Sequence, residues 1–138
     1  MKSILSLSIL LSLCVFACSS EEDYYTPESV VEANVKYMNE EKYEEAMNTI
    51  HKDSPAYQVS DTMIKQLFDM YDLNYKIVSM KVLEHNDSKA KIEFVQITTK
   101  LKGPEFKNNQ SRGIHTLKKD GDSWKIYSTE MTDFKLLN

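Results

Sequence analysis

The side chains best suited to chemistry in this sequence are two cysteines and three histidines. Both cysteines, Cys14 and Cys18, lie near the N-terminus, so the chain after them offers no thiol for catalysis, for a disulfide or for a metal. The histidines, at positions 51, 85 and 115, are scattered and lack the close spacing of metal ligands. We therefore predict no catalytic residue, no cofactor and no metal, and we expect covalent chemistry at Cys18 alone.

The segment in front of Cys18 is typical of a secretory leader. Met1 and Lys2 give a positively charged start, and a mostly apolar run follows over residues 4–16. At about thirteen residues this run is shorter than the roughly 20 that a transmembrane helix needs, and it fits the core of a signal peptide. We predict that residues 1–17 are a signal peptide.

The leader ends in Val15-Phe16-Ala17-Cys18, which resembles the lipobox of bacterial lipoproteins. This resemblance implies that the leader is removed in front of Cys18 and that the Cys18 thiol carries a lipid that anchors the protein in a membrane. The alternative is an ordinary secretory leader cleaved after Ala17, which leaves Cys18 free. The favoured prediction is a lipid-anchored protein of the cell envelope, at the outer membrane or the cell surface.

Residues 18–25 are expected to form a short acidic tether behind the anchor. Their triplet Glu21-Glu22-Asp23 resembles the surface-export signal of some Gram-negative lipoproteins, and plain solubility explains it equally well. The net charge of −4 over 138 residues disfavours a nucleic-acid partner, because such binding relies on clustered Lys and Arg. The predicted organisation is signal peptide, tether and one domain over residues 26–138.

Helical periodicity dominates the first half of this domain. Thr26-Pro27 suits an N-cap followed by the first helical position, and apolar residues then recur at three- and four-residue spacing. A second helix is expected over Tyr43–Ile50, with glutamates on its solvent face. Ser60 is expected to cap a third helix, after a loop over residues 51–59.

From about Leu73 onward the pattern changes to alternation rich in β-branched residues, which predicts strands. Turns are expected at Asn86-Asp87-Ser88 and at Asp120-Gly121. The predicted strands cover residues 75–85, 89–101, 110–118 and 123–134. Three helices followed by four strands predict an α+β domain in which the helices pack on a curved antiparallel sheet.

This order of elements resembles the nuclear-transport-factor-2-like superfamily, a cone-shaped α+β fold that includes the SnoaL-like proteins. The resemblance covers residues 26–134 and rests on the Thr26-Pro27-Glu28 helix start, the Tyr43–Ile50 helix and the ending Leu117–Ile126, a strand, a glycine turn and a Trp-Lys-Ile strand. It implies a pocket between the concave face of the sheet and the helices.

Five residues are candidates for that pocket. The two-residue period of a strand places Phe94 and Gln96 on one inward face, and it allows His115 to line the same cavity. In the functional interpretation, His115 and Gln96 orient a ligand between walls formed by Phe94, Phe68 and Tyr37. The simpler interpretation, favoured at this point, is that His115 and Gln96 are polar groups at the core edge with backbone partners.

The paired catalytic groups of enzymes in this superfamily do not map clearly onto the chain, since Asp69 and Glu93 fit solvated faces better. We therefore predict a non-enzymatic binding module for a small apolar ligand or an envelope protein. One alternative is a structural or assembly subunit of an envelope complex, as a homodimer through the open sheet face. Another is an enzyme of the SnoaL-like isomerase or dehydratase type.

Overall fold

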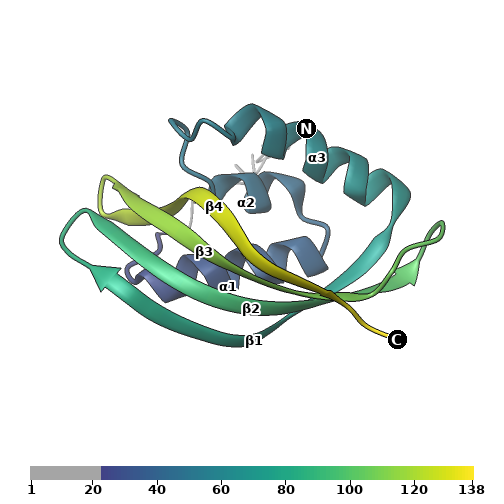
Figure 1. The fold of residues 1–138 in the computed structure, drawn as a ribbon. Helices are drawn as coiled ribbons and strands as arrows, with labels where there is room; N and C mark the ends of the chain where they lie inside the picture. The colour runs from purple at the N-terminus through teal and green to yellow at the C-terminus, as the bar shows by residue number, and fades with distance from the viewer. Residues whose placement is uncertain (1–22) are drawn as a thin grey trace, which may run out of the picture.

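The computed structural model describes residues 23–138, and it confirms the predicted α+β class (Figure 1). The predicted signal peptide and Cys18 lie outside the described residues. The sheet has the order β1-β2-β3-β4 and is antiparallel throughout. The elements are α1 Pro27–Asn39, α2 Tyr43–Asn48, α3 Tyr57–Met70, β1 Asp72–His85, β2 Lys89–Lys102, β3 Asn109–Asp120 and β4 Ser123–Leu136.

The first helix begins where the sequence predicts. The Thr26 hydroxyl accepts a hydrogen bond from the Ser29 backbone N–H at 3.2 Å, and the Ser29 hydroxyl accepts one from the Thr26 N–H at 3.3 Å. Pro27 follows as the first helical residue. With its start fixed in this way, α1 lies against the sheet and contacts β1, β2 and β4.

The third helix corrects the sequence prediction, because it begins at Tyr57 and Ser60 does not cap it. Ser54 sets this start: its hydroxyl accepts from the Ala56 N–H, and its carbonyl accepts from the Tyr57 N–H at 3.0 Å. A serine side chain that accepts a hydrogen bond from the backbone two residues later forms a local turn. Alternation and helix periodicity do not detect such a turn. The contact of α3 with the other helices is through α2.

The two ends of the concave sheet face differ in cover. At one end, a row across the sheet joins Ala90, Leu117 and Ile126, which are buried together with α1 residues in the core. We call this row and the core around it the closed end. At the other end, the equivalent row joins Gln96, Ser111 and Phe134. We call this row and its neighbours toward the end of β4 the open end, because Phe134 is 61% exposed.

Two hairpin turns have the residues that the sequence predicts for them. The Asn86 side-chain oxygen accepts from the backbone N–H groups of Ser88 and Lys89, which closes the turn between β1 and β2. Gly121 has a φ of +61° between β3 and β4, a left-handed conformation that glycine adopts without strain. These tight turns keep neighbouring strands in register, so residues far apart in sequence share rows across the sheet.

No helix within residues 23–138 has the length and apolar character needed to cross a membrane.

Candidate functional site

The sheet brings Phe94 and His115 together in the middle of its concave face. Their rings are stacked, with 4.2 Å between centroids and 16° between planes. They lie diagonally, because Phe94 is opposite Gly113 and His115 is opposite Ile92. In this stacked pair, which we call the platform, Phe94 is 5% exposed and His115 is half-buried.

Gly113 makes room for this platform. A Cβ atom at Gly113 would lie 2.8 Å from Cζ of Phe94 and 2.7 Å from the Glu130 carbonyl oxygen, closer than carbon atoms pack. The missing side chain therefore lets the Phe94 ring rest against the backbone of β3. From that position the ring reaches the imidazole of His115.

The imidazole of His115 is neutral near pH 7, and one of its two nitrogen atoms is without a hydrogen-bond partner among the described residues. Burial lowers the pKa of His115 to about 4. Its Nδ1 atom shares a hydrogen bond with the Thr129 hydroxyl at 2.8 Å. Throughout residues 23–138, every buried side-chain nitrogen or oxygen atom has a partner, whereas Nε2 of His115 has none. It follows that Nε2 keeps some contact with solvent, at the surface of a half-buried ring.

Gln96 lies in the row next to Phe94, on the same face. Its half-buried side-chain amide forms no hydrogen bond with any described residue, so it too faces solvent. The rows from Val82-Ile92-His115-Thr129 to Tyr75-Thr98-Asn109-Leu136 contain no charged side chain on this face. The platform is therefore surrounded by apolar and neutral polar groups, which suits an uncharged ligand better than an ion.

The two other candidates lie on helices. Tyr37 is 4% exposed and belongs to the core cluster around α1. Phe68 is half-buried on α3 and forms no aromatic contact with the platform. The sheet thus places Phe94, Gln96 and His115 on one face, whereas the pocket walls predicted from Tyr37 and Phe68 stay a prediction.

A groove of about 960 Å³, which the sequence did not suggest, lies between the helices and the β3–β4 turn. Lys125 is buried there and donates to the Asn48 carbonyl oxygen at 2.6 Å and to its side-chain oxygen at 3.2 Å. Lys125 is part of a run of four buried residues, Ser123 to Ile126, although alternation normally exposes every second residue of an edge strand. Side chains of both charges line the groove, among them Lys36, Lys42, Glu44, Glu45 and Asp120.

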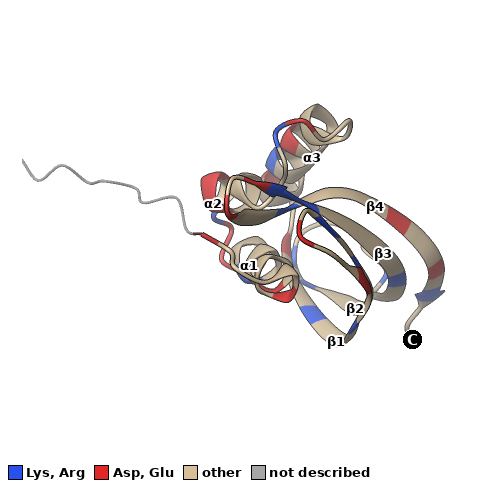
Figure 2. Cartoon of the chain, turned by 90° about the vertical axis from the view of Figure 1, so that its left-hand side faces the viewer, with Lys and Arg blue, Asp and Glu red and all other residues tan. Residues whose placement is uncertain are grey.

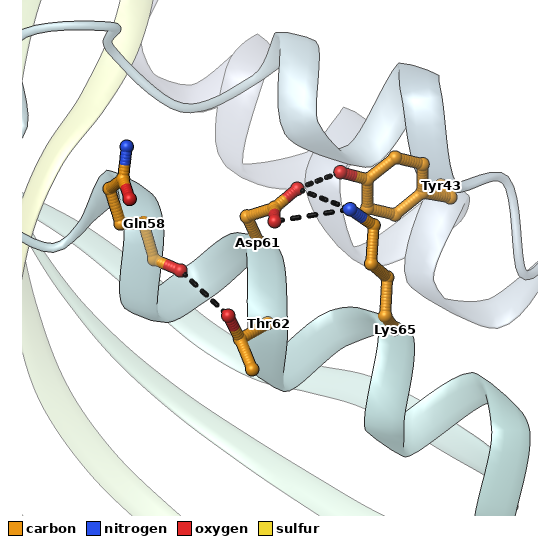
Figure 3. A network of polar contacts seen from close by, with 5 residues as sticks. All are labelled: Tyr43, Gln58, Asp61, Thr62 and Lys65. Carbon is orange, nitrogen blue, oxygen red and sulfur yellow. Dashed lines mark hydrogen bonds and ion pairs between the residues drawn. The ribbon is translucent and has the colours of Figure 1, made fainter.

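A polar cluster joins α2 to α3 (Figure 3). The Asp61 carboxylate accepts a hydrogen bond from the Tyr43 hydroxyl and pairs with Nζ of Lys65 at 3.0 Å. The Tyr43 hydrogen bond is the main cause that lowers the pKa of Asp61, and the same bond raises the pKa of Tyr43. The cluster lies on the exposed side of α3, and we interpret it as a link that holds α3 to α2.

The described part of the chain contains no group of three His, Cys, Asp or Glu side chains placed to hold a metal ion. His115 is likewise without an acidic partner, since no carboxylate in residues 23–138 bonds it. Glu93 pairs instead with Arg112 at 3.3 Å on the other face of the sheet, and Asp69 is exposed.

Comparison with known proteins identifies relatives of two kinds. The family model of the C-terminal domain of anti-sigma-I factor RsgI9 matches residues 29–137. The anti-sigma-I factor RsgI9 of Acetivibrio thermocellus is 37% identical over 67 residues, 49% of this chain. The match covers only 10% of that protein, so the chain spans a small part of its relative's length.

Solved structures show the same fold. A scytalone dehydratase-like protein from Novosphingobium aromaticivorans superposes with a TM-score of 0.64 at 11% identity, over 80% of this chain and 85% of the other. A nuclear-transport-factor-2-like protein from Shewanella oneidensis gives a TM-score of 0.59 at 12% identity, over 77% and 95% of the two chains. At such low identity these likenesses concern the fold alone, and they confirm the predicted cone-shaped architecture.

Proposed function

We propose that this chain is a non-enzymatic binding module carried at the cell envelope. The chain belongs to the family of the C-terminal domain of anti-sigma-I factor RsgI9, which supports this proposal. The observation that carries the proposal is the platform, in which half-buried His115 covers the buried ring of Phe94 on an uncharged face of the sheet. Its ligand is a small, uncharged and largely apolar molecule. The ring of the ligand packs beside the platform, against the half-buried His115, and its polar atoms bond Nε2 of His115 and the amide of Gln96.

Binding is favoured over catalysis by the surroundings of His115. General acid–base catalysis usually employs a group whose pKa lies near the working pH, often oriented by a second polar group. Burial lowers the pKa of His115 to about 4, and its partner is a threonine hydroxyl. A neutral imidazole held in this way serves well as a hydrogen-bonding group for a ligand.

A role in signalling is supported by the relative. The Acetivibrio protein is named an anti-sigma-I factor, and the matching region is a small part of it. We propose that the corresponding region here recognises a molecule and that the regulatory output belongs to other parts or partners. An envelope protein is the second class of partner for the same open end.

A binding experiment on the full chain tests the proposed site. The probes are indole and benzamide, two uncharged flat molecules of which the second also carries an amide. We expect both to bind weakly in saturation-transfer NMR, and we expect His115→Ala and Phe94→Ala to reduce the signal. Tyr57→Ala is the matched control, because Tyr57 lines the groove by the helices. Equal loss of binding in the Tyr57 variant, or no loss in the platform variants, would refute the proposed site.

Attachment to the envelope is tested separately at Cys18. A labelled fatty acid supplied during growth should label the protein, and Cys18→Ala should abolish the label because the thiol carries the lipid. Cys14→Ala is the control and should keep the label. Label that persists in the Cys18 variant would refute lipidation at this residue.

A further inference from the structure

The far half of β4, over residues 129–136, is an open edge of the sheet. Along the first half of β4 this edge is paired: the Ile126 N–H donates to the Thr49 carbonyl, and the His51 N–H donates to the Ile126 carbonyl. The last contact is the Ser54 hydroxyl, which donates to the Tyr127 carbonyl at 2.6 Å. Beyond it, no backbone hydrogen bond from residues 23–138 reaches the edge, so its N–H and C=O groups can pair with another strand.

The two edges of the sheet are protected to different degrees. Register shifts and exposed lysines both protect an edge against strand pairing: the β1 edge has three register shifts with Lys76 and Lys81, whereas residues 129–136 of β4 have one register shift and Lys135. The open part of β4 also presents apolar side chains on the concave face. Met131, Phe134 and Leu136 are 53%, 61% and 48% exposed. Exposed apolar groups beside a free edge are typical of an interface.

A bulge gives this segment a pattern that matches itself. Met131 lies opposite Gly113 and Asp133 opposite Arg112, so Thr132 is an extra residue on β4. The extra residue places Met131 and Phe134 on the same face although they are three positions apart. On either side of the bulge, an apolar residue lies on the concave face, Met131 before it and Phe134 after it. The next residue outward on each side, Glu130 or Lys135, is charged and lies on the other face.

We propose that a second copy of this chain pairs antiparallel with residues 129–136, edge to edge, about a two-fold axis at the bulge. In that register Met131 lies opposite the partner's Phe134, which covers both exposed side chains. Glu130 lies opposite the partner's Lys135, on the other face. Because the axis repeats each contact, the dimer gains two apolar pairs and two pairs of opposite charge, and it brings Asp133 next to the partner's Asp133 at the axis, which opposes association.

The charges favour a second copy over another occupant. Glu130 and Lys135 are both exposed, and neither forms an ion pair within residues 23–138. Figure 2 shows charges of both signs along the end of β4 that leads to the C-terminus. A different protein would need a strand with opposite charges at the matching positions, whereas a second copy of this chain already has them. The short length of the contact indicates a weak dimer.

A charge-swap series on the full chain, measured by sedimentation equilibrium in detergent, tests this pairing. Glu130→Lys and Lys135→Glu each place like charges opposite one another, and each should weaken the dimer by about tenfold. The double variant restores opposite charges and should return the dissociation constant close to that of the unchanged chain. Glu105→Lys, an equal change of charge in the loop after β2, is the matched control and should have no effect.

The outcomes distinguish this pairing from association through a different surface. All variants carry the same residues 1–22, so association through that segment is common to the series. Restoration in the double variant supports the proposed register, and it also shows that each single change left the fold intact. A monomer at every concentration would overturn the proposal. So would a dimer that the single changes do not weaken, because its interface would then lie elsewhere.

Discussion

The closed and open ends of the cone use the same four strands and the same face of the sheet, yet they differ in what covers them. At the closed end, Leu117 is 0% exposed beneath α1 and the core cluster. At the open end, Leu136 lies on the same face and is 48% exposed. The difference arises from the helices. Helix α1 packs on the sheet and covers the closed end, whereas α3 packs on α2. One face thus supplies both the stability of the domain and its proposed binding surface.

The largest effect should come from matched leucine truncations at the two ends. Leu117→Ala leaves a cavity in the core and should lower the free energy of unfolding by about 2–5 kcal/mol. Leu136→Ala removes an exposed side chain and should change it by no more than about 0.5 kcal/mol. Urea unfolding followed by circular dichroism measures both. Similar losses in the two variants would remove the distinction between the ends.

Gly113→Ala should destabilise the domain at the platform, which lies between the closed end and the open end. Its Cβ would lie 2.8 Å from Phe94, so the ring must shift at a cost of about 1–3 kcal/mol. The NMR signals of the His115 ring should move as well, because the stack is disturbed. Gly121→Ala is the control: its positive φ costs about 1 kcal/mol, and the platform signals should stay in place. Unmoved His115 signals in the Gly113 variant would contradict the packing described for the platform.

The third prediction concerns pH. The folded protein keeps His115 neutral down to about pH 4, whereas the unfolded chain takes up this proton near pH 6.5. Unfolding therefore binds a proton between these values, and the free energy of unfolding falls as the pH drops through this window. His115→Gln should give a flatter dependence in urea titrations across the same range. An unchanged slope would assign the pH dependence to other groups.

The smallest effect is expected at the exposed link between α2 and α3. Tyr43→Phe removes the hydroxyl that donates to Asp61, so the amides of α3 should exchange faster with solvent. Because the cluster is exposed, the midpoint of urea unfolding should not move measurably. Thr62→Ala is the control, since the Thr62 hydroxyl bonds Gln58 within α3 alone. Equal exchange in both variants would show that the link does not hold α3.

The sequence predicted the fold well because its signals are local. The helix start at Thr26 depends on capping within three residues, and the strands depend on alternation that neighbouring turns keep in register. The start of α3 was wrong because Ser54 closes a turn that periodicity does not detect. Local patterns thus give element type more reliably than element boundaries.

The site was predicted less completely, because it depends on contacts between strands. Alternation placed Phe94 and Gln96 on one face, and the register between β2 and β3 adds His115 to it. Nothing in the sequence indicates that Gly113 makes room for the ring of Phe94, or that Lys125 is buried at a groove. Both features need the three-dimensional distance between residues that are far apart in the chain. Lipidation of Cys18 lies outside the described residues and stays a prediction.

The most direct test of the binding role is a set of intermolecular NOE measurements between indole and the full chain. We expect contacts from the bound ring to the protons of Phe94, His115 and Met131, at the open end of the concave face. Contacts to Tyr57 instead would place the ligand in the groove between the helices and would contradict the assignment of the platform as the binding site.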